Sequence, residues 1–215
     1  MNKVIKLLAV GLLVSLFSGC ATVTNMPLKK DVSSLDTSKK TVLVGRIKVK
    51  NKNKINQQPE LLVMSAKKKE EDLSFNQPTL ISATPKVGKD YIFSMAVEPG
   101  EITLGSVTFM RQNIFTLGTG AFDLNKKINI PSNKIVYIGN IEANIVPRKE
   151  NEPRAGSLIP LVDQAVTGFS SGTFKVDIKD NYNEDIALMR KTFPYLANKE
   201  ITKMVLSKWV YTKPQ

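Results

Sequence analysis

Hydrophobic and polar residues alternate along most of the chain with the period of two that is typical of half-buried β-strands. Between Val42 and Lys50, apolar side chains and Gly45 occupy one face, while Arg46 and Lys48 share the other face with Lys50. Short strands separated by frequent turns, without a βαβ rhythm, predict a mainly β protein built as an antiparallel β-sandwich. Further strands are expected within 61–66, 90–97, 102–110, 126–130, 134–146 and 173–178.

Two local signals refine this prediction. Pro99 and Gly100 suit the two central positions of a type II turn, so we expect the strands on either side of them to form a hairpin. Gly139 interrupts the long β-branched-rich range 134–146. A glycine at such a position indicates a β-bulge or a close approach of another backbone.

The pattern changes to a helical period near the end of the chain. Ile186 and Met189 lie on one face of a predicted helix that must end before Pro194. A second helix is expected over 198–206, capped by Asn198. Residues 179–215 are therefore predicted to form a helical extension that docks on the sandwich.

The first 20 residues have the pattern of an export signal. Lys3 and Lys6 are followed by an apolar run from Leu7 to Phe17 and then by Ser18-Gly19-Cys20. The run has about half of the roughly 20 residues that a membrane-spanning helix needs. Cys20 is the only cysteine, so as an ordinary thiol it would have no partner for an internal disulfide.

The stretch Leu16-Phe17-Ser18-Gly19-Cys20 resembles the lipobox of bacterial lipoproteins, with Phe17 at a position where those proteins usually carry Leu. The resemblance implies a cleaved signal over residues 1–19 and acylation of Cys20. Three acyl chains would anchor the protein stably, since one alone gives only marginal binding. Ala21 after the cysteine implies the outer membrane. The alternative is an ordinary secretory signal that leaves Cys20 as a free thiol.

Residues 20–40 are rich in Thr, Ser, Lys and Asp and show no sustained apolar period. They are expected to form a flexible tether with a reach of roughly 25 Å. The sandwich domain is then expected to occupy residues 41–178.

The charge of the chain limits the classes of binding partner that we expect. The formal net charge is +12, contributed mainly by Lys, and no zinc-finger or helix-turn-helix pattern accompanies it. Nucleic acid is therefore not an expected partner. A solvated Lys-rich surface is the simplest interpretation, and attraction to an acidic envelope polymer is the alternative. The candidate binding residues are Arg46, Lys48 and Lys50.

Candidate catalytic motifs lack essential partners. Gly168-Phe169-Ser170-Ser171-Gly172 matches the G-x-S-x-G nucleophile motif, but the chain contains no histidine to act as the base. A Ser-Lys dyad remains formally open, and a Gly/Ser linker is the simpler interpretation. No pair of carboxylates stands out for glycoside hydrolysis.

Metal and cofactor sites are not expected either. The absence of histidine and the acylation of Cys20 leave no usual zinc ligands. A turn and helix cap explain the oxygen-rich run better than a calcium site does, because the run lacks the glycine and the terminal Glu of an EF-hand. The residues of that run are Asp177, Asp180, Asn181, Asn183 and Asp185.

Val97–Leu104, Ile135–Ile141 and Asp180–Pro194 are three stretches that together resemble small bacterial lipoproteins with a transthyretin-like domain. The first is similar to the Pro-Gly hairpin of such domains, the second to a later strand, and the third to the tail. The resemblance implies a transthyretin-like β-sandwich and supplies no catalytic residue. We therefore expect a lipid-anchored, non-enzymatic envelope lipoprotein that binds an envelope protein or an acidic polymer. The alternative is an envelope hydrolase with a Ser or carboxylate nucleophile.

Overall fold

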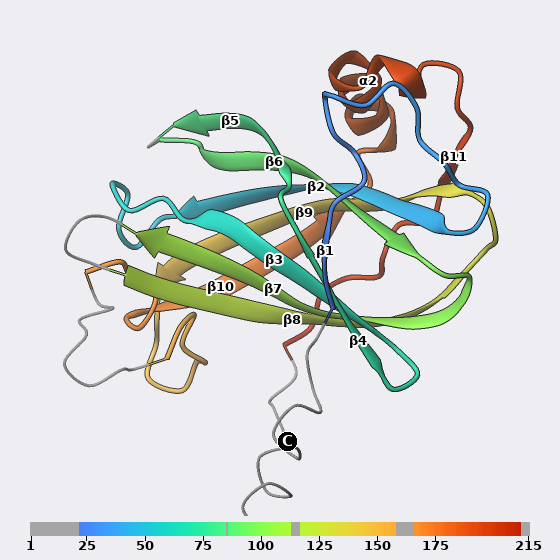
Figure 1. Cartoon of the computed structure of the whole chain (residues 1–215). Coiled ribbons are helices and arrows are strands. Elements are labelled where there is room, and N and C mark those ends of the chain that lie inside the picture. Colours follow the sequence, from blue (N-terminus) through green and yellow to red (C-terminus); the bar gives the residue numbers. More distant parts are fainter. Residues whose placement is uncertain (1–21, 85, 113–116, 158–165, 212–215) are drawn as a thin grey trace, which may run out of the picture.

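Two β-sheets lie face to face in the computed structural model, which describes residues 22–84, 86–112, 117–157 and 166–211 (Figure 1). Sheet A has the strand order β1-β4-β3-β7-β8, and sheet B has the order β10-β9-β2-β6-β5, with β11 also beside β9. The elements are β1 (Thr22–Asn25), β2 (Thr41–Asn51), β3 (Glu60–Lys68), β4 (Glu71–Asn76), β5 (Thr79–Thr84), β6 (Gly88–Val97), β7 (Gly100–Gln112), β8 (Leu117–Ile130), β9 (Ile135–Pro147), β10 (Gly172–Lys179), α2 (Tyr182–Thr192), the 3-10 turn η2 (Pro194–Leu196) and β11 (Ile201–Lys203).

The mainly β, sandwich-like prediction is confirmed, but the sheets are mixed instead of antiparallel. β2 pairs parallel with β9, β1 pairs parallel with β4, and β11 pairs parallel with β9. Alternation of side chains is the same in parallel and antiparallel strands, so the sequence pattern could not separate the two. The observed topology does not confirm the transthyretin-like arrangement.

The prediction of a hairpin at Pro99-Gly100 is wrong. β6 pairs with β2 and β5 in sheet B, whereas β7 pairs with β3 and β8 in sheet A. The turn therefore carries the chain from one sheet to the other. Phe93 on β6 and Phe109 on β7 are both fully buried in the core between the sheets, so the two strands face each other across that core.

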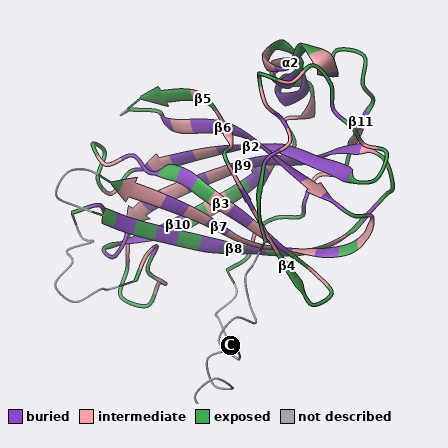
Figure 2. Ribbon diagram, in the orientation of Figure 1, coloured by how far each residue is buried: buried purple, intermediate pink, exposed green. Residues whose placement is uncertain are grey.

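The main core lies between the two sheets. The long strands place alternate residues in this core, and Figure 2 shows the alternation of buried and exposed residues most clearly on β8. Leu43, Ile47 and Val49 on β2 point into this core, as their period predicts.

A second core covers the other face of sheet B. Val42 and Val44 of β2 pack there with Ile186 and Met189 of α2, and all four are buried. The predicted helix is thus confirmed, and its apolar face is what fixes it to the sheet. In the range expected to form a second helix, the chain instead forms β11 and then an extended segment to Tyr211.

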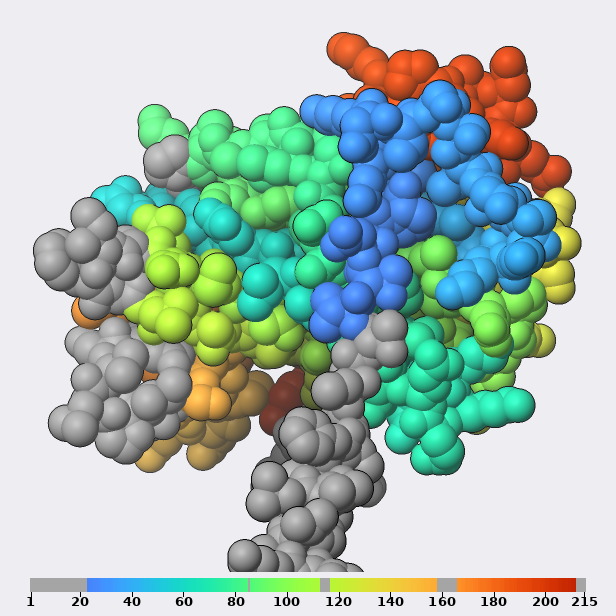
Figure 3. Space-filling view, in the orientation of Figure 1, coloured from blue at the N-terminus to red at the C-terminus, as the bar shows by residue number. Residues whose placement is uncertain are grey.

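Residues 22–40 do not form the expected free tether. β1 pairs with β4, Met26 enters the main core, and Leu28 enters the second core. The Leu28 backbone N–H donates to Ser94 Oγ at 3.0 Å. Figure 3 shows this segment, in blue, lying along one face of the molecule. Its apolar residues follow no regular period, so the pattern did not reveal their burial.

The bulge predicted at Gly139 is confirmed. The register of β2 against β9 shifts between Val44 and Arg46, which face Tyr137 and Asn140. Gly139 has φ +125°, a conformation that favours glycine. This bulge aims Tyr137 and Asn140 toward α2, where they meet the residues described below.

Candidate functional site

Arg46, one of the three predicted binding residues, is held in ion pairs at the boundary between sheet B and α2. Its Nε donates to Asp90 Oδ1 at 2.8 Å, its Nη2 pairs with Asp90 Oδ2, and its Nη1 pairs with Asp185 Oδ1 at 3.1 Å. The hydrogen bond to Asp90 raises the pKa of the guanidinium above its usual range. With 16% of its side chain exposed, Arg46 connects structural elements more than it presents charge to solvent.

Asp185 lies at the centre of this buried network and is fully buried. Tyr137 Oη donates to Asp185 Oδ2 at 2.7 Å, and Asn140 Nδ2 donates to the same oxygen at 3.1 Å. Burial, followed by the bond to Asp185, raises the pKa of Tyr137 above its usual value. The carboxylate therefore ties α2 to β2 and β9 at once.

Lys48 and Lys50 differ in their surroundings. Lys48 lies in register with Asp90 on β6 and with Glu142 on β9, so carboxylates of both neighbouring strands flank its position. Lys50 is two residues nearer the end of β2 and lies opposite Asn144. The positive face expected along β2 is thus balanced in the middle of the sheet and persists only at the strand end.

Unbalanced positive charge gathers at that strand end, over the β2–β3 loop, the β5–β6 turn and the end of β7. Glu60 is the one carboxylate of residues 50–60 and 86–89, and it pairs with Lys89 at 2.6 Å. We call this surface the basic end. Its cationic residues are Lys50, Lys52, Lys54, Lys86, Lys89 and Arg111.

Contacts between these segments hold the basic end together. Gly88 packs against the backbone of Val49 and Lys50, and Arg111 Nε donates to Gln57 Oε1 at 3.0 Å. A hollow of about 210 Å³ opens between the loop and the turn. Cations, amides and a hydroxyl are the groups that hydrogen-bond an anion. The hollow is lined by Asn56, Gln58, Ala83, Thr84, Lys89 and Arg111.

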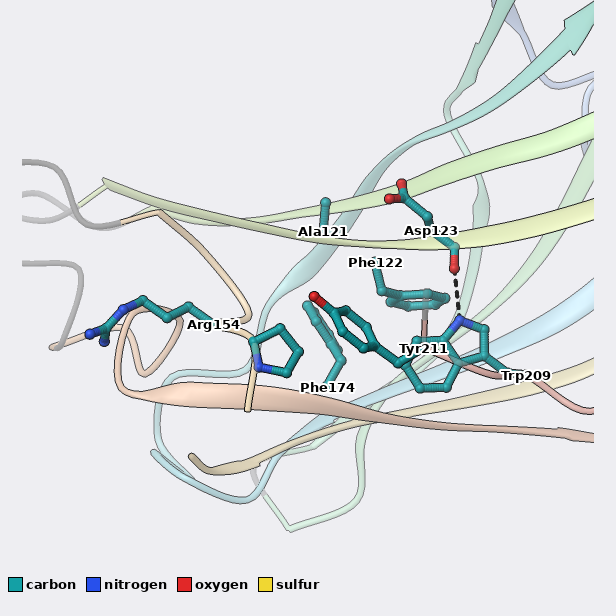
Figure 4. Close-up of a pocket in the computed structure, with 8 residues that line it drawn as sticks. Ala121, Phe122, Asp123, Arg154, Phe174, Trp209 and Tyr211 are labelled. Atoms are coloured by element: carbon teal, nitrogen blue, oxygen red, sulfur yellow. Dashed lines mark hydrogen bonds between the residues drawn. The ribbon is translucent and has the colours of Figure 1, made fainter. Parts of the chain in front are cut away.

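A second, aromatic hollow lies between the edge strands β8 and β10, at the open side of the sandwich (Figure 4). The rings of Phe122 and Phe174 are 5.2 Å apart, and Trp209 packs on Phe122 at 6.1 Å. Trp209 Nε1 donates to the carbonyl of Asp123 at 2.7 Å, which fixes the C-terminal segment against β8. The segment that carries Trp209 therefore lies against the sandwich.

This aromatic hollow, about 140 Å³, offers ring faces to a small apolar group. Figure 4 shows Arg154 at its rim with the guanidinium turned away from the rings. Its Nη1 donates to the carbonyl of Ser170 at 2.7 Å. Trp209 is the only tryptophan of the chain, so its fluorescence reports any ligand that enters here.

Ser170 does not occupy a nucleophile elbow. It is 3% exposed and lies in a turn that precedes β10, whereas the motif requires a turn between a strand and a helix. Nearby, a Cβ on Gly120 would stand 2.6 Å from the carbonyl oxygen of Ala155. Glycine at this position therefore lets the loop before β10 pack closely on β8.

The acidic residues of the oxygen-rich run, interpreted above as a turn and helix cap in preference to a calcium site, do not converge. Asp180 pairs with Lys203, Asp185 belongs to the buried network, and Asp177 projects from β10. Within the described ranges, no group of three or more acidic or cysteine side chains is placed to hold a metal ion. Cys20 lies outside the described residues. No helix among the described residues is long and apolar enough to cross a membrane.

Comparisons with protein-family models, with curated proteins and with solved structures find no match to this chain. The geometry of the surfaces described above therefore has to support any functional conclusion.

Sequence reasoning found Lys50 but missed the rest of the basic end and the aromatic hollow. The Lys-rich run from Lys50 to Lys54 was visible as a polar loop, and a count of charges by loop would have singled it out. Phe122 and Phe174 are 52 residues apart in sequence, so only the fold brings them together. The Gly-rich start of β8 concealed the strand that carries Phe122.

Alkaline pH should destabilise the fold through its buried tyrosines. Burial raises the pKa of Tyr91 to about 12, and the pKa of Tyr137 is raised as well. Because the folded-state pKa exceeds the unfolded value, this contribution to stability is complete below pH of about 10 and is lost as pH rises through about 12.

The measurement is urea unfolding of the wild type and Tyr91→Phe across this pH range, with Tyr211→Phe at an exposed tyrosine as control. We expect a shallower decline for Tyr91→Phe and an unchanged decline for Tyr211→Phe. Identical declines in all three proteins would contradict the prediction.

Proposed function

We propose that the protein is a lipid-anchored envelope lipoprotein that binds an acidic polymer through its basic end, without catalysing a reaction. The observation that carries this proposal is the concentration of cations around a hollow in segments where Glu60 is the one carboxylate. Elsewhere on sheet B, cations and carboxylates occupy neighbouring strands and compensate one another. Charge that is uncompensated on one surface attracts a polyanion over a Debye length of about 8 Å at physiological salt.

The side chains of the basic end indicate which class of acidic polymer it would bind. Lys predominates at the basic end, so it offers point charges to a series of acid groups and not a rigid bidentate fork for one. A carboxylated or phosphorylated envelope glycan has such a repeating charge. We also propose that the protein is related to transthyretin-like lipoproteins. The two-sheet fold and the helix near the C-terminus support this relation.

The test is binding of the soluble mature domain to polygalacturonate, a carboxylated glycan, with neutral dextran as the control polymer. The variant Lys52→Glu/Lys54→Glu/Lys86→Glu reverses three exposed charges of the basic end. Each Lys near an anionic surface contributes up to about 1 kcal/mol, so we expect a loss of affinity of about ten-fold or more.

A matched variant separates location from total charge. Lys67→Glu/Lys69→Glu/Lys127→Glu changes the net charge equally but at the other end of the sheets, and it should retain most of the affinity. Equal losses in both variants, or equal binding to dextran, would refute a specific basic-end site. Equal binding to polyglutamate would show that the glycan part of the proposal is wrong.

A further inference from the structure

The distance between the lipidated residue and the folded domain is very short. Thr22 already pairs with Leu73 in sheet A, and Ala21 alone separates it from Cys20. Two residues span at most about 7 Å. The domain therefore cannot move far from the membrane that holds the acyl chains.

Thr22 has a defined place along the sheet. Its row runs through Leu73 on β4, Ala66 on β3 and Leu104 on β7. Immediately beyond this row lies the β3–β4 hairpin, Lys67–Asp72, which we call the anchor end. In the other direction, β7 continues from Leu104 to Gln112, about 26 Å at a rise of 3.3 Å per residue.

The two ends differ in charge. Lys67, Lys69, Glu70, Glu71 and Asp72 at the anchor end are exposed, and their charges nearly cancel. Val23, next to the anchor, exposes 60% of its surface. The basic end lies at the opposite ends of the strands, as Figure 1 shows for the loop after β2 and the β3–β4 hairpin.

We propose that the bilayer holding the Cys20 acyl chains lies against the anchor end, so that the basic end faces away from that membrane. This inference rests on the acylation in the proposed function. On a long tether, the basic end would turn toward anionic headgroups, which attract Lys by about 1 kcal/mol per residue. The two-residue connection opposes that rotation and leaves the basic end available to a partner in the aqueous space.

Single cysteines make this orientation measurable, because Cys20 as a thioether does not react with thiol probes. The acylated protein is placed in vesicles of phosphatidylethanolamine and phosphatidylglycerol that carry an energy-acceptor headgroup. A donor dye is attached in one protein at Asp72→Cys and in the other at Lys86→Cys, both exposed positions. We expect transfer at least about two-fold stronger from position 72, given the separation of about 26 Å along the strands.

A second protein tests the cause. Insertion of about 20 Gly/Ser residues between Ala21 and Thr22 gives a reach of roughly 25 Å and should abolish the difference between the two dyes. Equal transfer in the native chain, or a difference that survives the insertion, would overturn the inference. Palmitate labelling of the same samples is measured separately. Unlabelled protein would refute the acylation of Cys20, whereas labelled protein with equal energy transfer would refute only the proposed orientation of the domain.

Discussion

Asp185→Ala is expected to lower the free energy of unfolding by about 3–5 kcal/mol, the usual cost of removing one partner from a buried ion pair. The substitution leaves Arg46 Nη1, the Tyr137 hydroxyl and the Asn140 amide without the acceptor that they share. Asn140 Oδ1 has no hydrogen-bond partner even in the intact network, so the substitution adds to the unpaired polar atoms of a site that already contains one. Urea unfolding followed by circular dichroism measures the change.

The matched control is Asp177→Ala, which removes a carboxylate from β10 whose side chain is 60% exposed. Exposed ion pairs contribute at most about 1 kcal/mol, so this variant should unfold near the wild-type midpoint. Similar midpoints for the two variants would show that the buried network does not hold α2 on sheet B. Asp185→Asn should fall between them, because it keeps the shape and loses the charge.

The same network shows what the sequence could predict and what it could not. Alternation around Arg46 correctly placed it on the side of β2 opposite Ile47, because side-chain direction is a local property. Its partners are Asp90 and Asp185, which are 44 and 139 residues away. No local pattern contains that information, so the side chain was predicted to be a free cation.

For a similar reason, the sequence did not predict which of the two sheets each strand joins. β6 and β7 were each recognisable from alternating apolar residues. However, the same residues are buried whether the two strands pair as a hairpin or lie in opposite sheets, so the pattern could not distinguish these arrangements. β8 was recognised only over its last third, since Gly118 and Gly120 near its start are poor strand formers. Those glycines are required by the loops that pack on β8, and such contacts arise only in the folded chain.

The N-terminal segment gives the clearest consequence for function. Met26 and Leu28 are separated by Pro27, and neither a strand period nor a helical period predicts their burial. Each nevertheless packs into a different core. With that segment fixed, the acyl anchor proposed at Cys20 would be joined directly to the domain and not through a free tether. The proposed acylation would then determine both the anchoring and the orientation of the domain.

Cys20→Ala is therefore expected to have an all-or-none effect on location. Each acyl CH2 buried in a bilayer contributes about 0.8 kcal/mol, and no comparable hydrophobic contribution is expected from the exposed surface of the folded domain. Palmitate labelling should disappear, and the protein should move from the membrane pellet to the soluble fraction.

The basic-end variant Lys52→Glu/Lys54→Glu/Lys86→Glu is the control, and it should remain labelled and in the pellet. If Cys20→Ala stays in the membrane at high salt, where attraction between Lys and headgroups is screened, the lipoprotein assignment is wrong. If Cys20→Ala is released but keeps the wild-type affinity for polygalacturonate, anchoring and polymer binding are separate functions of the same domain. The acyl chains would then determine where the basic end works, while the basic end alone determines what it binds.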